Sequence, residues 1–155
     1  RRVCFEDGQV DEVDAVVLCT GYRVTFPFFD ESFVSAPGNQ LSLYLRMFRP
    51  GIAGLAFVGL CQPLGAVMPI AERQGQLLAA YLRGNYALPG IQDMQRAVAR
   101  DETAQSRRYV HSPRHTMQVD FDDFMGTLAR ELKEGAARAR RRGQRLPVQA
   151  RARFG

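Results

Sequence analysis

Two continuously apolar segments constrain the fold more than any other feature of this sequence. Residues 15–19 read Ala-Val-Val-Leu-Cys and residues 55–60 read Leu-Ala-Phe-Val-Gly-Leu, with no polar alternation in either. A strand that is apolar on both faces is typical of a parallel sheet covered on both sides. Two or three such strands cannot hide both faces by themselves. The sequence therefore predicts an α/β chain whose own sheet is incomplete and needs neighbouring strands from elsewhere.

Turn signals organise the N-terminal part of the chain. Asp7-Gly8 lies between alternating apolar positions and predicts a hairpin of residues 2–6 and 9–12, because both turn residues tolerate positive φ. Prolines, glycines and aromatic residues without helical period fill residues 22–50. This stretch is expected to be loop, with a short strand at 41–44.

Amphipathic helices are predicted in the second half. The first starts near Pro69 and ends at a Gly84 cap. Its apolar stripe consists of Ile70, Leu77, Leu78, Tyr81 and Leu82. A weaker surface helix runs from about 91 to 107, and a third begins after Asp120 as N-cap. The third carries Phe121, Phe124, Met125, Leu128 and Leu132 at helical spacing. Arginines then replace the apolar stripe, so residues 136–155 are predicted to form a mobile tail.

Composition and charge limit the class of protein. With 155 residues and 46% hydrophobic content, one ordinary core is the expectation. The net charge of +5 is unevenly distributed, because residues 138–153 contain seven arginines and no acid. That stretch leaves a basic nucleic-acid-binding module as an alternative. Nucleic acid is disfavoured as a partner, because Phe154 is the only aromatic residue of the tail that could stack on a base.

Cysteine number and hydropathy indicate a soluble protein of the cytoplasm. Cys4, Cys19 and Cys61 are odd in number and have no metal-site spacing, which favours a reducing compartment. No apolar run approaches the roughly 18 to 20 residues of a membrane span. His111 and His115 flank Pro113, so local structure is favoured over metal binding.

A cation site is also conceivable at a group of three aspartates, Asp120, Asp122 and Asp123. A helix N-terminus explains acids there electrostatically, so capping is favoured over a cation site. No metal ligand is assigned.

Two glycine-bearing strand ends are the candidate cofactor sites. Thr20, Gly21 and Tyr22 follow the segment 15–19, at the carboxyl edge where open α/β sheets bind ligands. Gln62, Pro63, Leu64 and Gly65 follow the segment 55–60 and precede the first helix, whose free N–H groups favour negative charge. Gln62 adds both a donor and an acceptor. An ordinary tight turn remains the alternative for each, and no catalytic residue is assigned.

Taken in order, these segments resemble the C-terminal portion of flavin-containing monooxygenases over about residues 10–135. The matching segments are Cys19-Thr-Gly-Tyr22, Phe26-Pro-Phe28, Ser42-Leu-Tyr44, Gly59-Leu-Cys-Gln-Pro-Leu-Gly-Ala66, Met68-Pro-Ile-Ala-Glu72, Gln74-Gly-Gln76, Arg107-Arg-Tyr109, Thr116-Met-Gln-Val-Asp120 and Phe124-Met125. Cys19 stands where the family has Ala.

The resemblance implies a partial two-dinucleotide-binding, Rossmann-like flavoprotein fold with FAD and NADPH as cofactors. Residues 1–50 would end the NADPH-binding domain and cross back to the FAD domain, and residues 51–135 would form the C-terminal part of the FAD-binding domain. The implied activity is of the N,N-dimethylaniline monooxygenase type. NADPH reduces the flavin, O2 adds to give a C4a-hydroperoxide, and an amine or sulfide takes the distal oxygen.

Departures from the family refine these expectations. The glycine fingerprint G-x-G-x-x-G is absent from the chain. The chain is therefore expected to be a fragment, inactive alone, whose partner is the missing N-terminal half of the same fold. No terminal apolar anchor is seen, which favours a soluble, bacterial-type member, and a homodimer is a further expectation. A Baeyer-Villiger-type monooxygenase or another two-dinucleotide flavoenzyme remains an alternative.

Overall fold

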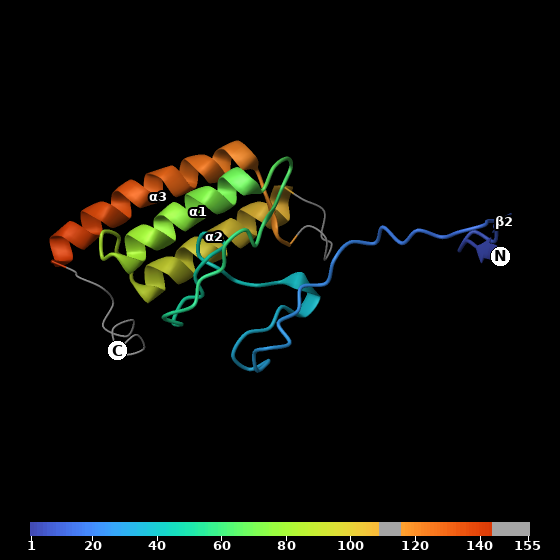
Figure 1. Cartoon of the computed structure of the whole chain (residues 1–155), viewed down its shortest axis with the longest axis horizontal. Coiled ribbons are helices and arrows are strands. Elements are labelled where there is room, and N and C mark those ends of the chain that lie inside the picture. The colour runs from blue at the N-terminus through green and yellow to red at the C-terminus, as the bar shows by residue number, and fades with distance from the viewer. Residues whose placement is uncertain (109–115, 144–155) are drawn as a thin grey trace.

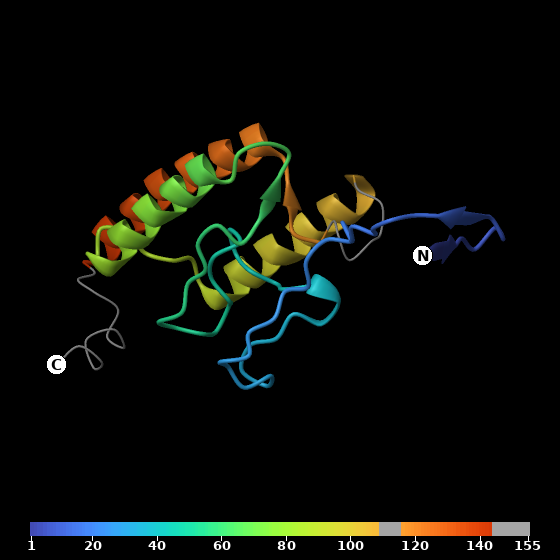
Figure 2. The same cartoon turned by 45° about the vertical axis from the view of Figure 1, so that its right-hand side comes forward.

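Helices form the body of the protein in a computed structural model that describes residues 1–108 and 116–143 (Figure 1). The helices are α1 (Met68–Leu82), α2 (Ile91–Arg108) and α3 (Phe121–Arg142), with a 3-10 turn at Pro37–Asn39. The strands are β1 (Arg2–Cys4), β2 (Val10–Glu12), β3 (Gln62–Pro63) and β4 (Gln118–Val119). In both views α1 and α3 lie side by side and run in the same direction, while α2 runs back across them (Figures 1 and 2).

The main core lies where the helices meet the loop that precedes them. Ile70 and Leu77 of α1 and Leu128 of α3 are fully buried. Met47 and Phe48 come from the irregular segment and complete this cluster. Burying a side chain of this size contributes roughly 1.5 to 3 kcal/mol before entropy is counted. The described chain therefore has its own core, although its sheets have only two strands each.

The helix α1 matches its prediction closely. Pro69 lies in its first turn, where the missing N–H costs nothing, and Gly84 follows its end with a φ of 76°. Four of the five predicted stripe residues are buried or packed against the core. The fifth, Leu82, is exposed.

The helix α3 is longer than predicted. Asp120 caps it as expected, and the helix continues through Arg142 to a left-handed Gly143. The prediction of a mobile tail is therefore wrong for residues 136–142. Small residues explain the error, since Gly135 and Ala139 continue the buried face that Leu128 begins. The remainder of the predicted tail, residues 144–155, lies outside the described residues.

The N-terminal arm, defined here as residues 1–23, projects from the helical body (Figure 1). Its tip is the predicted hairpin, with Val3 paired to Asp11 in an antiparallel register and Gly8 at a φ of 87°. Residues 14–23 are exposed throughout and form no strand, so the prediction of a buried strand at 15–19 is wrong for the isolated chain. A strand is held by the hydrogen bonds of a neighbouring strand, and no described segment supplies one here.

The second apolar segment, residues 55–60, also lacks strand pairing in the described structure, and so do residues 41–44 apart from one bridge between Tyr44 and Phe48. Instead, Leu55, Phe57 and Leu60 pack against a small second cluster. That cluster consists of Val34, Leu41 and Leu43, with Phe26, Phe29 and Ala36 at its margin. Among the residues described, no helix is long and apolar enough to cross a membrane.

Candidate functional site

Short parallel strands bring the loop before α1 beside the loop before α3. β3 pairs with β4, so that Gln62 lies opposite Gln118 and Pro63 opposite Val119. The Gln62 N–H donates to the carbonyl of Met117 over 2.8 Å. Each strand then leads into a helix, and both helices start from the same edge of this small sheet (Figure 2).

The loop between Gly59 and Gly65, which we call the α1 loop, contains all four residues of the second predicted site. Both glycines have positive φ, 73° and 125°, which side-chain-bearing residues rarely adopt. Gln62 and Gly65 are exposed, and Leu64 is 75% exposed. The predicted residues Gln62–Gly65 therefore lie together on an accessible loop at the start of α1.

The start of α1 has no cap of its own. Its N-cap position, Val67, makes no side-chain hydrogen bond, and the first turn contains no acid. By contrast, α3 begins with Asp120 as a cap and has Asp122 and Asp123 in its first turn. Unsatisfied N–H groups and the helix dipole stabilise partial negative charge, so the α1 loop suits an anionic or electron-rich group.

The other predicted residues, Thr20, Gly21 and Tyr22, lie on the exposed arm. Tyr22 is 97% exposed, and Gly21 has a φ of 90°. Asn39 holds the end of the arm: its amide donates to the Tyr22 carbonyl over 2.9 Å and its oxygen accepts from the Val24 N–H over 2.8 Å. Within the described residues, no hydrogen bond or ion pair joins this group to Gln62–Gly65.

Sequence reasoning missed the groups that hold the α1 loop in place. Gln74 of α1 is fully buried; its Oε1 accepts from the Gly59 N–H over 2.8 Å, and its Nε2 donates to the Leu45 carbonyl over 3.1 Å. The signal for this role was a polar residue on the apolar stripe, four positions after Ile70 and three before Leu77.

A strained turn accompanies Gln74. Leu45 and Arg46 both have a φ of 55°, in the left-handed region that costs energy for residues with a Cβ. The Arg46 guanidinium donates to the Gln105 Oε1 over 3.0 Å and to the Thr116 carbonyl over 3.3 Å. Desolvation lowers the pKa of Arg46, although nearby Asp101 favours its charged form.

A second missed group surrounds a buried carboxylate in α3. Glu131 accepts from the Tyr86 hydroxyl over 2.7 Å and forms an ion pair with Arg138. The Arg138 Nε donates to the Ala87 carbonyl over 2.9 Å. Beside these groups lies a cleft of about 390 Å³ that Tyr44 and residues of α2 and α3 line. The side chains of Tyr86 and Arg138 thus both bond to the buried Glu131 carboxylate, which indicates a structural role for the cluster.

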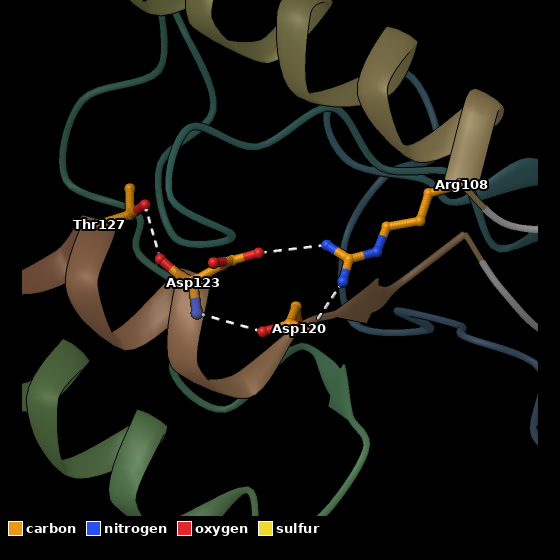
Figure 3. A network of polar contacts seen from close by, with 4 residues as sticks. All are labelled: Arg108, Asp120, Asp123 and Thr127. Atoms are coloured by element: carbon orange, nitrogen blue, oxygen red, sulfur yellow. Dashed lines mark hydrogen bonds and ion pairs between the residues drawn. The ribbon is translucent and has the colours of Figure 1, made fainter.

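The aspartates at the start of α3 serve as caps and ion-pair partners (Figure 3). The Asp123 N–H donates to the Asp120 side chain over 3.2 Å, and Arg108 of α2 bridges both carboxylates at 3.0 and 3.1 Å. The Thr127 hydroxyl donates to the Asp123 carbonyl over 2.9 Å. The capping interpretation is confirmed. His111 and His115 lie outside the described residues, and no metal-ligand cluster occurs among those described.

Comparison with known proteins decides the family. Residues 1–136 match the flavin-binding monooxygenase-like family. The chain belongs to that family. It is 42% identical over 128 residues to flavin-containing monooxygenase 5 of Homo sapiens, a match that covers 81% of this chain and 24% of the relative. It is 35% identical over 133 residues to dimethylaniline monooxygenase [N-oxide-forming] 2 of Rattus norvegicus, covering 84% of this chain and 25% of the relative.

Comparison with solved structures gives the same result as the sequence comparison. The fold is similar to that of S-allyl-L-cysteine S-oxygenase from Allium sativum, with a TM-score of 0.69 and 31% identity over 85% of this chain and 31% of that one. Together, family and structural likeness identify an α/β flavoprotein fold. The flavin-binding monooxygenase-like chain spans about a quarter of the length of the curated relatives it matches.

Proposed function

We propose that this chain is the C-terminal part of an FAD- and NADPH-dependent monooxygenase that oxygenates amines or sulfides. The observation that carries the proposal is the family match over residues 1–136. Two relatives support the substrate class by name, since one is described as N-oxide-forming and the other as an S-oxygenase.

The geometry of the α1 loop fits a flavin. A flavin site needs backbone N–H groups or a positive helix end near the electron-rich ring or the phosphates. The Gln62–Gly65 loop offers an accessible backbone, a side-chain amide at Gln62 and an uncapped helix start. FAD bound there supplies the redox chemistry and the oxygen activation. The contribution of this chain is to bind and orient the ring and to exclude water from it.

The domain boundaries follow from the same proposal. Residues 1–50 end the NADPH-binding domain and return to the FAD domain, and residues 51–135 form the C-terminal part of the FAD domain. Thr20, Gly21 and Tyr22 then belong to the crossing between the nucleotide domains. The separation of this group from Gln62–Gly65 agrees with a boundary between them.

The partner of the arm is the N-terminal part of the same fold. Val17 is 81% exposed and Leu18 is 79% exposed, although both are apolar and Val17 is a β-branched residue that favours strands. Neighbouring strands from the preceding part would cover them and complete the sheet. The chain alone is therefore proposed to lack catalytic activity.

The test uses the complete protein, in which the nucleotide-binding part precedes residue 1. It is expected to retain FAD through gel filtration and to oxidise NADPH faster when an amine or a thioether is supplied. Product analysis should show an N-oxide or a sulfoxide. Stoichiometric conversion of a ketone to an ester, without N- or S-oxygenation, would instead establish the Baeyer-Villiger alternative.

A further inference from the structure

Gln74 occupies a position where packing alone would select an apolar side chain. It lies between Ile70 and Leu77 on the buried face of α1, and all three are fully buried. Burying an amide without partners is strongly unfavourable in an apolar medium, so its hydrogen bonds decide whether it is tolerated. Both ends of the Gln74 amide are in fact bonded.

Each partner of Gln74 is a backbone group at a conformationally unusual position. The acceptor end takes the N–H of Gly59, which begins the α1 loop with a φ of 73°. The donor end bonds the carbonyl of Leu45, inside the left-handed turn. A Cβ on Gly59 would lie 3.7 Å from the Ala71 Cβ, so the loop passes close to the helix at this point. One side chain thus ties two loops, remote in sequence, to the first half of α1.

We propose that Gln74 is a positioning residue for the cofactor: it fixes the backbone of Gly59 against α1 and so pre-forms the Gly59–Gly65 loop for FAD. This role rests on the proposed function. A pre-formed loop binds its ligand more tightly, because the conformational entropy of the loop is lost when the protein folds and not when the ligand binds. Gln74 touches no cofactor atom itself and acts through the loop.

The test compares Gln74→Met with Gln76→Met in the complete protein. Methionine keeps the volume of the side chain and removes both hydrogen bonds. Gln76 is a matched control, because it lies two residues away on the exposed face of the same helix. We expect the FAD dissociation constant, measured by flavin fluorescence, to rise at least ~10-fold in Gln74→Met and to stay unchanged in Gln76→Met. The visible absorption bands of the residual bound flavin should also shift.

Three results distinguish a failure of the role proposed for Gln74 from a failure of the proposed function. A folded Gln74→Met protein with the wild-type FAD dissociation constant and flavin spectrum overturns the role of Gln74 and leaves the proposed function standing. A complete wild-type protein that binds no FAD overturns the proposed function and this role with it. If Gln74→Met does not fold, hydrogen exchange on the wild-type protein tests whether the loop is ordered before FAD binds. Protection of the Gly59 amide before FAD is added supports pre-formation, and protection that appears only with FAD overturns it.

Discussion

The ring of Tyr86 lies against the bare backbone of Gly135 in the middle of α3. A Cβ built on Gly135 would clash with the Tyr86 Cδ2 and Cε2 atoms, and the Gly135 carbonyl accepts from the Ala87 N–H over 3.0 Å. Both contacts require the chain after α1 to lie directly on α3. Gly135 is therefore an element of tertiary packing, although it weakens the helix locally.

The first prediction concerns this contact. Gly135→Ala should lower the free energy of unfolding by roughly 1 to 3 kcal/mol, because overpacking outweighs the gain in helix propensity. Gly126→Ala is the matched control, since Gly126 lies in the same helix with nothing within 4 Å of a Cβ. The control should be stabilised by about 0.5 to 1 kcal/mol. Urea unfolding of the two variants measures both changes, and changes of the same sign would contradict the packing argument.

The second prediction concerns the ion pair made by Arg138, a residue that sequence reasoning assigned to a mobile tail. Arg138 pairs with Glu131, whose side chain is only 9% exposed. Arg138→Ala leaves that carboxylate buried and without its cation, which should lower the free energy of unfolding by roughly 3 kcal/mol. Arg140→Ala, two residues on and exposed, should change it by less than about 0.5 kcal/mol. Equal effects of the two substitutions in urea unfolding would contradict a structural role for the end of α3.

The third prediction is a loss of stability at alkaline pH. Burial, followed by the charge of Glu131, raises the pKa of Tyr86 far above its ordinary value of 10.0. The unfolded chain releases this proton above about pH 10 while the folded chain retains it, so stability falls as pH rises from there towards the folded pKa. One tyrosine contributes a slope of up to about 1.4 kcal/mol per pH unit in this window.

Tyr86→Phe isolates this contribution. The variant loses the hydrogen bond to Glu131, so it should be less stable than the wild type near pH 7. Its stability should nevertheless fall less steeply between pH 10 and 11. Burial also raises the pKa of Tyr44 and of Cys61, and both groups are present in the two proteins, so their contribution to the pH dependence is shared. Parallel pH profiles of the two proteins in urea unfolding would contradict the assignment to Tyr86.

The helices were predictable because their signals are local. The apolar stripe of α1, its Pro69 and Gly84 ends, and the Asp120 cap of α3 all follow from spacing within one or two turns. The hairpin at Asp7-Gly8 follows from the turn residues alone. Such elements depend little on contacts with distant residues, so the sequence predicts them even in a chain that spans only part of its relatives.

The parts that sequence reasoning missed depend on distant partners. The left-handed turn at Leu45–Arg46 has no glycine or asparagine to reveal it, and its support comes from Gln74, Gln105 and Thr116. The strand predicted at residues 15–19 is absent for the converse reason. Its pattern describes an environment with covered faces, and the described chain does not provide that environment.

The last prediction tests whether that environment is the N-terminal part of the same fold. Val17→Lys should leave the unfolding midpoint of the chain alone unchanged, because the side chain is 81% exposed and has no core contact to lose. In the complete fold the same lysine would enter a covered strand, where an unpaired charge is strongly unfavourable. The preceding part, expressed separately, should therefore bind the wild-type chain and bind the variant at least ~10-fold more weakly. Gln9→Lys, at an exposed polar position of the hairpin, is the control for the added charge. If Val17→Lys bound as tightly as the wild type, residues 15–19 would not be a strand of the assembled sheet, and the proposed crossing between the nucleotide domains would have to lie elsewhere.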